Sequence, residues 1–225
     1  MRALLDLLFP PSCAGCRGLV PGQAPFCLAC RETLAELPAA HCPTCGEPDV
    51  EGTCPHCLAE PPAFERVTAP YLHGGALADA IHRLKYEDRP QLAGPLCSLL
   101  APALADDLAW SDLVAPISLH SARLKSRGYD QALLLARELA FTAGRPVAAR
   151  AVRRVRETTP QVGKDRGQRR ENVDGAFVGD PEVAGKRILL VDDVLTTGAT
   201  AHAAAKACRQ AGALAVRVAA LARAG

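Results

Sequence analysis

The chain has 225 residues, of which 49% are hydrophobic, 22% charged and only 4% aromatic, and its formal net charge is +2. This length accommodates one α/β domain with a sizeable core and a small appendage. No uninterrupted apolar run approaches the ~20 residues that a membrane span requires, so we expect no membrane insertion.

The N-terminal apolar stretch at residues 4–9 is LLDLLF. It is too short for a secretion signal and contains an acidic residue, so it is typical of a packing helix. Without a targeting signal, the predicted compartment is the cytoplasm.

Eight of the ten cysteines form four Cys-x-x-Cys pairs within the first 57 residues. Each such pair presents two thiolates from one turn, and two pairs complete a tetrahedral zinc site with four cysteine ligands. The gaps between pairs predict two consecutive sites, although an interleaved arrangement is the alternative. Disulfides and redox catalysis are the competing interpretations, but a reducing compartment and the fourfold repetition favour zinc. The predicted zinc ligands are Cys13, Cys16, Cys27, Cys30, Cys42, Cys45, Cys54 and Cys57.

Both zinc ions would be structural, because a site with four protein ligands leaves no position for an activated water. The sequence divides into a double zinc-ribbon domain at residues 1–60 and an α/β domain at residues 64–225, joined by a proline-containing linker. Cys97 and Cys208 lie alone on helical patterns and are predicted to be buried apolar residues.

Hydrophobic periodicity predicts alternating strands and helices in the second domain. This alternation is typical of a mostly parallel sheet with helices on both faces, whose ligand site lies across the carboxyl ends of the strands. A loop at residues 154–175 has no periodicity and many charges, and its length suits a lid. The predicted strands are residues 64–72, 113–117, 146–149, 187–191 and 215–221, and the predicted helices are residues 76–85, 91–104, 130–142 and 200–210.

The most informative segment is ILLVDDVLTTGAT at residues 188–200. Its aliphatic run predicts a buried strand. Asp192 and Asp193 would then lie at the carboxyl end of this strand, at the edge of the sheet where ligands bind. The small-residue turn that follows offers hydroxyls and backbone N–H groups at the start of a helix, where an anion is favoured. Ordinary helix-start residues are the alternative explanation. The length of the pattern favours a ribose-phosphate site.

These thirteen residues resemble the phosphoribosyl-pyrophosphate (PRPP) motif of type I phosphoribosyltransferases. The upstream segments narrow the resemblance to the ComF family of competence-associated proteins, and order and spacing match from about Cys13 to the C-terminus. Two residues depart from the family pattern: Ser118 replaces a common proline, and Asp130 replaces a common asparagine. The supporting segments are RLKY at 83–86, API at 115–117, RGYDQ at 127–131, TPQ at 159–161, RREN at 169–172 and GAF at 175–177.

The resemblance implies a type I phosphoribosyltransferase fold that binds PRPP with Mg²⁺. Asp192 and Asp193 would take the ribose hydroxyls, and the turn would hold the 5′-phosphate through Thr196, Thr197, Gly198, Ala199 and Thr200. Pyrophosphate would lie against the loop that contains Ile117, Ser118 and Arg123. Arg169 and Lys164 on the lid, and Lys85 from the first helix, are candidate contacts to that pyrophosphate, and Lys85 and Arg169 join the two carboxylates as candidate catalytic residues.

Three functions from different classes fit these expectations. The first is a phosphoribosyltransferase linked to natural transformation and DNA uptake, whose acceptor the sequence does not identify. The second is a competence factor that binds single-stranded DNA together with the DNA-uptake machinery, and the third is a PRPP-sensing regulator without turnover. Residues 120–172 carry 13 Lys and Arg against 5 Asp and Glu, which favours a polyanionic partner, although a solvated basic surface is the alternative. Aromatic candidates for base stacking near basic residues are few, namely Tyr86, Tyr129 and Phe177.

Overall fold

The structure is a computed structural model, and it describes residues 11–20, 24–119, 124–125, 127–156 and 173–224. The predicted N-terminal helix at residues 4–9 and most of the predicted lid lie outside these residues.

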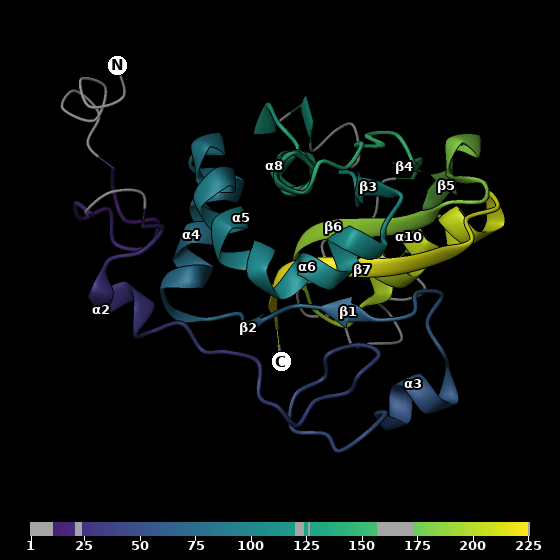
Figure 1. Cartoon of the computed structure of the whole chain (residues 1–225), viewed down its shortest axis with the longest axis horizontal. Coiled ribbons are helices and arrows are strands. Elements are labelled where there is room, and N and C mark those ends of the chain that lie inside the picture. Colours follow the sequence, from purple (N-terminus) through teal and green to yellow (C-terminus); the bar gives the residue numbers. More distant parts are fainter. Residues whose placement is uncertain (1–10, 21–23, 120–123, 126, 157–172, 225) are drawn as a thin grey trace.

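The main sheet of the described chain has five strands, and its pairings are parallel. The strand order is β1-β7-β6-β3, and β2 extends the edge by pairing with β7 beyond β1. A separate antiparallel ribbon is formed by β4 and β5 (Figure 1). The strands are β1 Val67–Thr68, β2 Tyr71–Leu72, β3 Leu113–Pro116, β4 Val152–Arg154, β5 Phe177–Gly179, β6 Arg187–Leu195 and β7 Ala215–Arg223.

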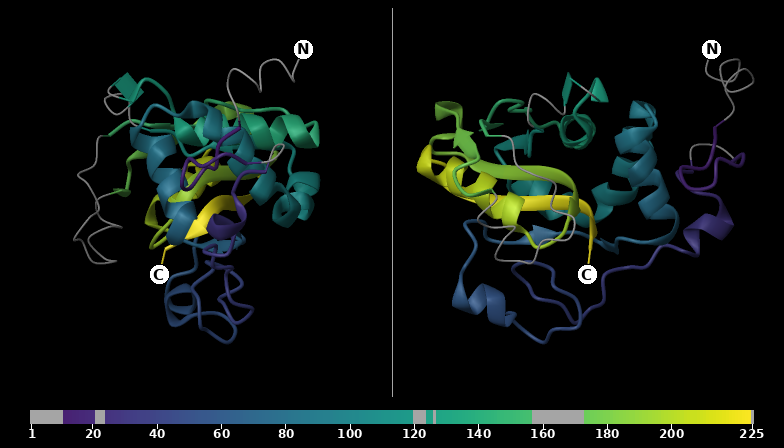
Figure 2. Two further views of the ribbon diagram at one scale, coloured as in Figure 1. Left: turned by 90° about the vertical axis from the view of Figure 1, so that its left-hand side faces the viewer. Right: turned by 180° about the vertical axis from the view of Figure 1, so that it is seen from behind.

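Helices cover both faces of this sheet, as predicted (Figure 2). Alternate residues of β6 enter two different cores: Leu189 and Val191 pack with α4, α5 and α8, whereas Ile188 and Leu190 pack with α10. This is the period-two pattern of a strand buried on both faces. The helices are α2 Leu28–Arg31, α3 Pro55–Ala59, α4 Gly75–Tyr86, α5 Ala93–Leu100, α6 Ala105–Trp110, α8 Gln131–Ala143 and α10 Ala199–Gln210, with 3-10 turns η1 Pro90–Leu92, η2 Ala101–Leu104 and η3 Pro181–Val183.

Two predicted elements are interrupted by proline. The strand predicted at residues 64–72 is split into β1 and β2, with Pro70, which has no N–H for a strand ladder, between them. The helix predicted at residues 91–104 is a succession of η1, α5 and η2, because Pro102 cannot continue the α-helical hydrogen bonds of α5.

Two further strand predictions need correction, and two observed strands lie outside the predicted set. Residues 146–149 form only an isolated parallel bridge, between Val147 and Val114, rather than a strand. Strands β4 and β5, which flank the predicted lid, were not predicted. Strand β6 runs to Leu195, four residues beyond its predicted end.

The segment Pro90–Trp110 is long and apolar enough by composition to cross a membrane, with a mean hydropathy of 1.3. The leucines make this segment apolar, and they are buried in the core on one face of the sheet. The segment is also divided into η1, α5, η2 and α6 rather than forming one continuous helix. Its apolar character is therefore explained by packing. The leucines in question are Leu92, Leu96, Leu100, Leu104 and Leu108.

Candidate functional site

The two acidic residues of the PRPP-like motif lie inside strand β6 rather than after it. Asp192 is in register with Ala220 and Val194 with Ala222, so pairing with β7 continues past the acids. Each carboxylate accepts a hydrogen bond from the next backbone N–H, from Asp193 N to Asp192 Oδ1 at 2.8 Å and from Val194 N to Asp193 Oδ1 at 2.7 Å. Backbone contacts thus fix both side chains at the carboxyl-terminal part of the strand.

Lys85, on the last turn of α4, reaches this carboxylate pair. Its Nζ lies 2.8 Å from Asp193 Oδ1, and the side chains are 21% and 5% exposed. The other oxygen of Asp193, Oδ2, is buried and has no hydrogen-bond partner among the described residues. A buried carboxylate oxygen without a partner is costly, so a ligand hydroxyl at this position would satisfy it.

The charges at this edge of the sheet shift one another's protonation. Burial and the neighbouring Asp193 carboxylate raise the pKa of Asp192 to about 8, against the opposing effect of Lys85. Burial alone would lower the pKa of Lys85, but the Asp193 carboxylate outweighs it and raises that pKa above its ordinary value. Near neutral pH the pair of acids therefore retains a proton that a bound cation or a change of pH can displace.

His73 is a site residue that the sequence analysis missed. It follows β2 directly, and its pKa is lowered by burial and by the positive charge of Lys85, with Asp193 opposing. Its imidazole is therefore neutral at neutral pH. A histidine immediately after a predicted strand of a parallel sheet is the signal that would have found it, since carboxyl ends of strands gather at one edge.

Asp130, the residue that departs from the expected asparagine, has a structural role at the start of α8. It is the N-cap of α8 and accepts from Leu133 N through Oδ1 and from Leu119 N through Oδ2, at 3.2 and 3.0 Å. A carboxylate supplies two acceptor oxygens, whereas an amide supplies one. Burial raises the pKa of Asp130, these backbone donors lower it, and the Asp193 charge raises it further, for a net increase. Asp130 thus secures the loop that follows β3.

That loop is only partly described. Ile117 is buried and donates its N–H to Val191 O at 2.8 Å, so that N–H is already engaged within the sheet and the predicted contact of Ile117 with a ligand stays a prediction. Ser118 is half-buried beside it. Arg123, Arg169 and Lys164 lie outside the described residues, so their predicted contacts stay predictions.

The predicted phosphate turn connects β6 to α10 at residues 196–198. Gly198 is the N-cap of α10 with φ +77°, a left-handed conformation that glycine adopts without penalty. It adds no side-chain cap, and the first turn of α10 carries no acidic residue. Ala199, at the start of the helix, donates its N–H to Thr197 Oγ1 at 3.4 Å, and Thr196 is exposed while Thr200 is half-buried. The helix start is therefore suited to an anion.

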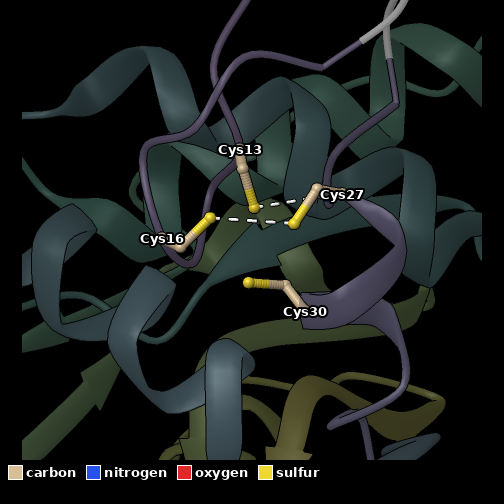
Figure 3. Close-up of side chains that lie close together, drawn as sticks. All are labelled: Cys13, Cys16, Cys27 and Cys30. Atoms are coloured by element: carbon tan, nitrogen blue, oxygen red, sulfur yellow. Dashed lines mark hydrogen bonds between the residues drawn. The ribbon is translucent and has the colours of Figure 1, made fainter.

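The cysteines form two separate groups of four, each with sulfur atoms within 4.8 Å of one another. The sequential arrangement is thereby confirmed over the interleaved one. Sγ–Sγ distances of 3.7 Å (Cys16 to Cys27) and 3.6 Å (Cys45 to Cys54) fit the edge of about 3.8 Å in a tetrahedron with Zn–S bonds of about 2.3 Å. Figure 3 shows the four sulfur atoms of the first group converging on one point from a loop and from the start of α2.

The two ribbons repeat the same outer hydrogen bonds. Cys27 N donates to Cys13 Sγ and Cys54 N to Cys42 Sγ, both at 3.3 Å. Burial would raise the pKa of Cys13 and of Cys42, but these backbone donors lower each of them to about 6. Each ribbon therefore holds a thiolate ready for metal at neutral pH.

The first ribbon is packed into the main core beside α4 (Figure 2). The buried Arg83 donates through Nη1 to the carbonyl oxygens of Ala14 at 2.5 Å and Gly15 at 2.9 Å. A Cβ at Gly15 would meet Ala76 Cβ at 2.7 Å, so the ribbon backbone approaches α4 too closely for any other residue. The metal site and the α/β domain therefore share one packed interface.

The second ribbon lies beside the phosphate turn. A pocket of about 330 Å³ separates them, with Cys45, His56 and Cys57 on the ribbon side and Thr197 and Gly198 on the other. Arg223, at the end of β7, binds Glu47 of this ribbon at 2.5 Å. Two cysteines of the second candidate metal site thus line a wall of the candidate ligand site.

This fold and site define a class: a type I phosphoribosyltransferase domain joined to an N-terminal double zinc ribbon. Family models agree, since a double zinc ribbon domain matches residues 4–60 and a phosphoribosyl transferase domain matches residues 124–225. Competence protein F of Haemophilus influenzae is 30% identical over 223 residues, which cover 94% of this chain and 96% of that protein. DNA utilization protein YhgH of Escherichia coli is 31% identical over 221 residues, with the same coverage of 94% and 96%.

Among solved structures, the allosteric regulatory enzyme of purine biosynthesis is similar at 19% identity, with a TM-score of 0.43 over 62% of this chain and 30% of that one. The extent and identity of the first two matches are decisive. The chain belongs to the ComF family of competence and DNA utilization proteins, which confirms the resemblance drawn from its sequence.

Proposed function

We propose that this protein binds PRPP as its Mg²⁺ complex and transfers the phosphoribosyl group to an acceptor. The observation that carries the proposal is the partnerless oxygen of Asp193, buried beside Lys85 and five residues before the glycine-capped start of α10. One segment thus offers acceptors for ribose hydroxyls and donors for a phosphate.

Each part of PRPP has a group suited to it. Asp192 and Asp193 accept hydrogen bonds from the ribose hydroxyls, and the turn at residues 196–200 receives the 5′-phosphate. The pyrophosphate lies toward the loop after β3, where Arg123 is a proposed contact. Lys85 orients Asp193 through their ion pair, and it and Arg169 remain the proposed catalytic cations.

The donor set fits Mg²⁺, which prefers carboxylate and phosphate oxygens and retains waters. When bound, Mg²⁺ neutralises the pyrophosphate leaving group. The reaction passes through an oxocarbenium-like state, so the protein's task is to position the ribose and exclude water rather than to supply a nucleophile. The backbone-fixed carboxylates of β6 perform that positioning.

Reduced thiols support a cytoplasmic location for this activity. Eight zinc-ligating cysteines require a compartment in which thiols are not oxidised to disulfides. The two isolated cysteines, Cys97 and Cys208, are buried as predicted and are free.

A pyrophosphate-release assay tests turnover. Protein with PRPP and Mg²⁺ is mixed with a panel of nucleobases, nucleotides and single-stranded DNA, and release above the acceptor-free rate identifies both class and acceptor. Binding of PRPP without release for every acceptor would instead favour the PRPP-sensing regulator.

Single-stranded DNA binding is the second candidate function. Relatives named for competence and DNA utilization support it, and so does the excess of cations in residues 120–172. Three aromatic residues near basic side chains, Tyr86, Tyr129 and Phe177, are the candidates for base stacking.

A further inference from the structure

Two segments next to the PRPP site contain aromatic and basic side chains that the site does not use, and these segments contact each other. The segment RLKY ends α4, and RGYDQ leads into α8. Tyr129 Oη donates to Leu84 O at 2.5 Å, and the guanidinium of Arg127 lies 5.0 Å from the centre of the Tyr86 ring. Arg127 also donates to the Gln131 side chain, which holds its guanidinium over the ring.

Of the three aromatic candidates, only Tyr86 presents a ring to solvent. Phe177 is 6% exposed and lies under Arg154, and Tyr129 is half-buried with its hydroxyl bound to the backbone. Tyr86 is 66% exposed. Tyr86 follows two residues that are themselves held in place, so its backbone is fixed before a ligand arrives. A ring that is exposed on a fixed backbone is preorganised for stacking.

The neighbours of Tyr86 hold it in place. Leu84 is fully buried, and Lys85 is tied to Asp193 at 2.8 Å. The His82 ring lies 5.0 Å from the Tyr86 ring at an angle of 48°, so aromatic and cationic groups flank the tyrosine.

The charge around the ring suits a polyanion. Glu87, the acid next to Tyr86, is bound by Arg17 of the first zinc ribbon at 2.6 Å. Lys125 is exposed two residues before Arg127, and Asp88 is the exposed acid of the following turn. The first ribbon therefore offsets the negative charge of Glu87, the acid next to the Tyr86 ring.

We propose that Tyr86 and Arg127 form a stacking platform for one base of a single-stranded nucleic acid, with the adjoining phosphates near Arg127 and Lys125. An aromatic ring carrying a guanidinium is the combination that binds unpaired bases without sequence preference. The inference deepens the DNA-binding candidate function and places the strand beside the ribose-binding carboxylates. It does not depend on turnover.

The test measures two affinities on the full-length zinc-loaded protein. Fluorescence anisotropy follows a labelled oligothymidylate of about 12 nucleotides at low salt, and calorimetry follows Mg-PRPP. Tyr86→Ala is expected to weaken oligonucleotide binding about 5- to 150-fold, the range for loss of one stacked base, while Tyr86→Phe retains it. Phe141→Ala is the matched control, because Phe141 is 88% exposed at the other end of α8 and should have no effect.

Salt dependence separates the two partners of the platform. Tyr86→Ala should lower the affinity without changing the slope of log affinity against log salt, whereas Arg127→Gln should reduce that slope by about one phosphate contact. Oligonucleotide affinity unchanged in Tyr86→Ala, or no binding by the wild type at low salt, would overturn the platform. Failure of Mg-PRPP to bind would contradict the proposed function instead.

Discussion

Replacing Lys85 with methionine perturbs the ion pair that organises the candidate site. Lys85 and Asp193 are 21% and 5% exposed at their side chains, so removing the ammonium leaves a charge in a poorly solvated position. Loss of one partner of a buried ion pair costs about 3–5 kcal/mol of unfolding free energy. For a chain of this size, that corresponds to a fall in Tm of about 6–20 °C.

A double-mutant cycle isolates the pair from other effects of the substitution. Asp193→Asn should also destabilise the protein, because it leaves Lys85 buried without its carboxylate. The double variant Lys85→Met, Asp193→Asn removes both charges, so it should be more stable than the sum of the single changes predicts. Thermal unfolding in reducing, zinc-containing buffer measures all four proteins.

The loss of stability in Lys85→Met, relative to the wild type, should depend on pH. In the wild type the pKa of Asp192 is already raised to about 8, and loss of the Lys85 charge raises the proton affinity of the folded pair further, so the native variant binds more protons than the native wild type. Stability of the variant then falls more steeply than that of the wild type over the pH range in which it holds the additional proton, by up to about 1.4 kcal/mol per pH unit. The gap between wild type and variant should therefore be smaller at low pH and larger at high pH. A variant within about 2 °C of wild type throughout, or strictly additive single changes, would refute this reasoning.

Further predictions concern the metal sites, the phosphate turn and two titrating groups. Freshly purified reduced protein should contain two zinc ions per chain by elemental analysis, and one or none would count against the assignment of two four-cysteine sites. Gly198→Ala should cost about 1–2 kcal/mol in thermal unfolding because its φ of +77° is left-handed, and an unchanged Tm would show that the turn relaxes freely. PRPP affinity should rise with pH up to about 8 and then level off, because ionised Asp192 is the better acceptor for ribose hydroxyls, and a flat profile would oppose this. Burial raises the pKa of Cys97 and of Cys208 to about 12, so both should resist alkylation in the native protein at pH 8 and react in urea, as mass spectrometry would show.

The interface between the first ribbon and α4 changes one expectation from the sequence. The ribbons contain few apolar residues, which predicts that zinc removal unfolds only the first 57 residues. Arg83 and the close approach of Gly15 to Ala76 join the first ribbon to the main core instead. Chelation should therefore also destabilise α4, and hydrogen exchange along α4 with and without chelator measures this effect.

Periodic patterns were sufficient to predict most of the fold. The alternation of apolar runs placed α4, α8, α10 and the parallel strands within a few residues of their observed bounds, because each buries one face or two against its neighbours. Cysteine spacing likewise predicted both metal sites, since ligand geometry limits which spacings can work. The predicted strand ends were less accurate. Strand β6 continues past Val191, because its pairing with β7 tolerates acidic residues that local strand propensity does not favour.

Long-range contacts in the site could not be predicted in the same way. The contact of Lys85 with pyrophosphate stays a prediction, and its ion pair with Asp193 depends on how α4 packs across the strand ends, for which the sequence has no local signal. The motif alone indicates only a ligand as the partner of Asp192 and Asp193, whereas the structure adds Lys85 as a protein partner of Asp193. His73 enters the site through tertiary packing alone, and the role of Asp130 follows from two backbone donors, one of them 11 residues away in sequence.

Calorimetric titration of the full-length protein with PRPP, with and without Mg²⁺, tests the central claim that the β6–α10 segment is a PRPP site. The wild type should bind one PRPP per chain only when Mg²⁺ is present. Asp192→Asn keeps the hydrogen bond from Asp193 N and leaves the Lys85 pair intact, so it should remain folded. At a pH above about 8, where Asp192 is ionised, its PRPP affinity should fall at least about tenfold through the loss of one charged hydrogen bond. No binding by the wild type, or undiminished binding by Asp192→Asn, would contradict the account.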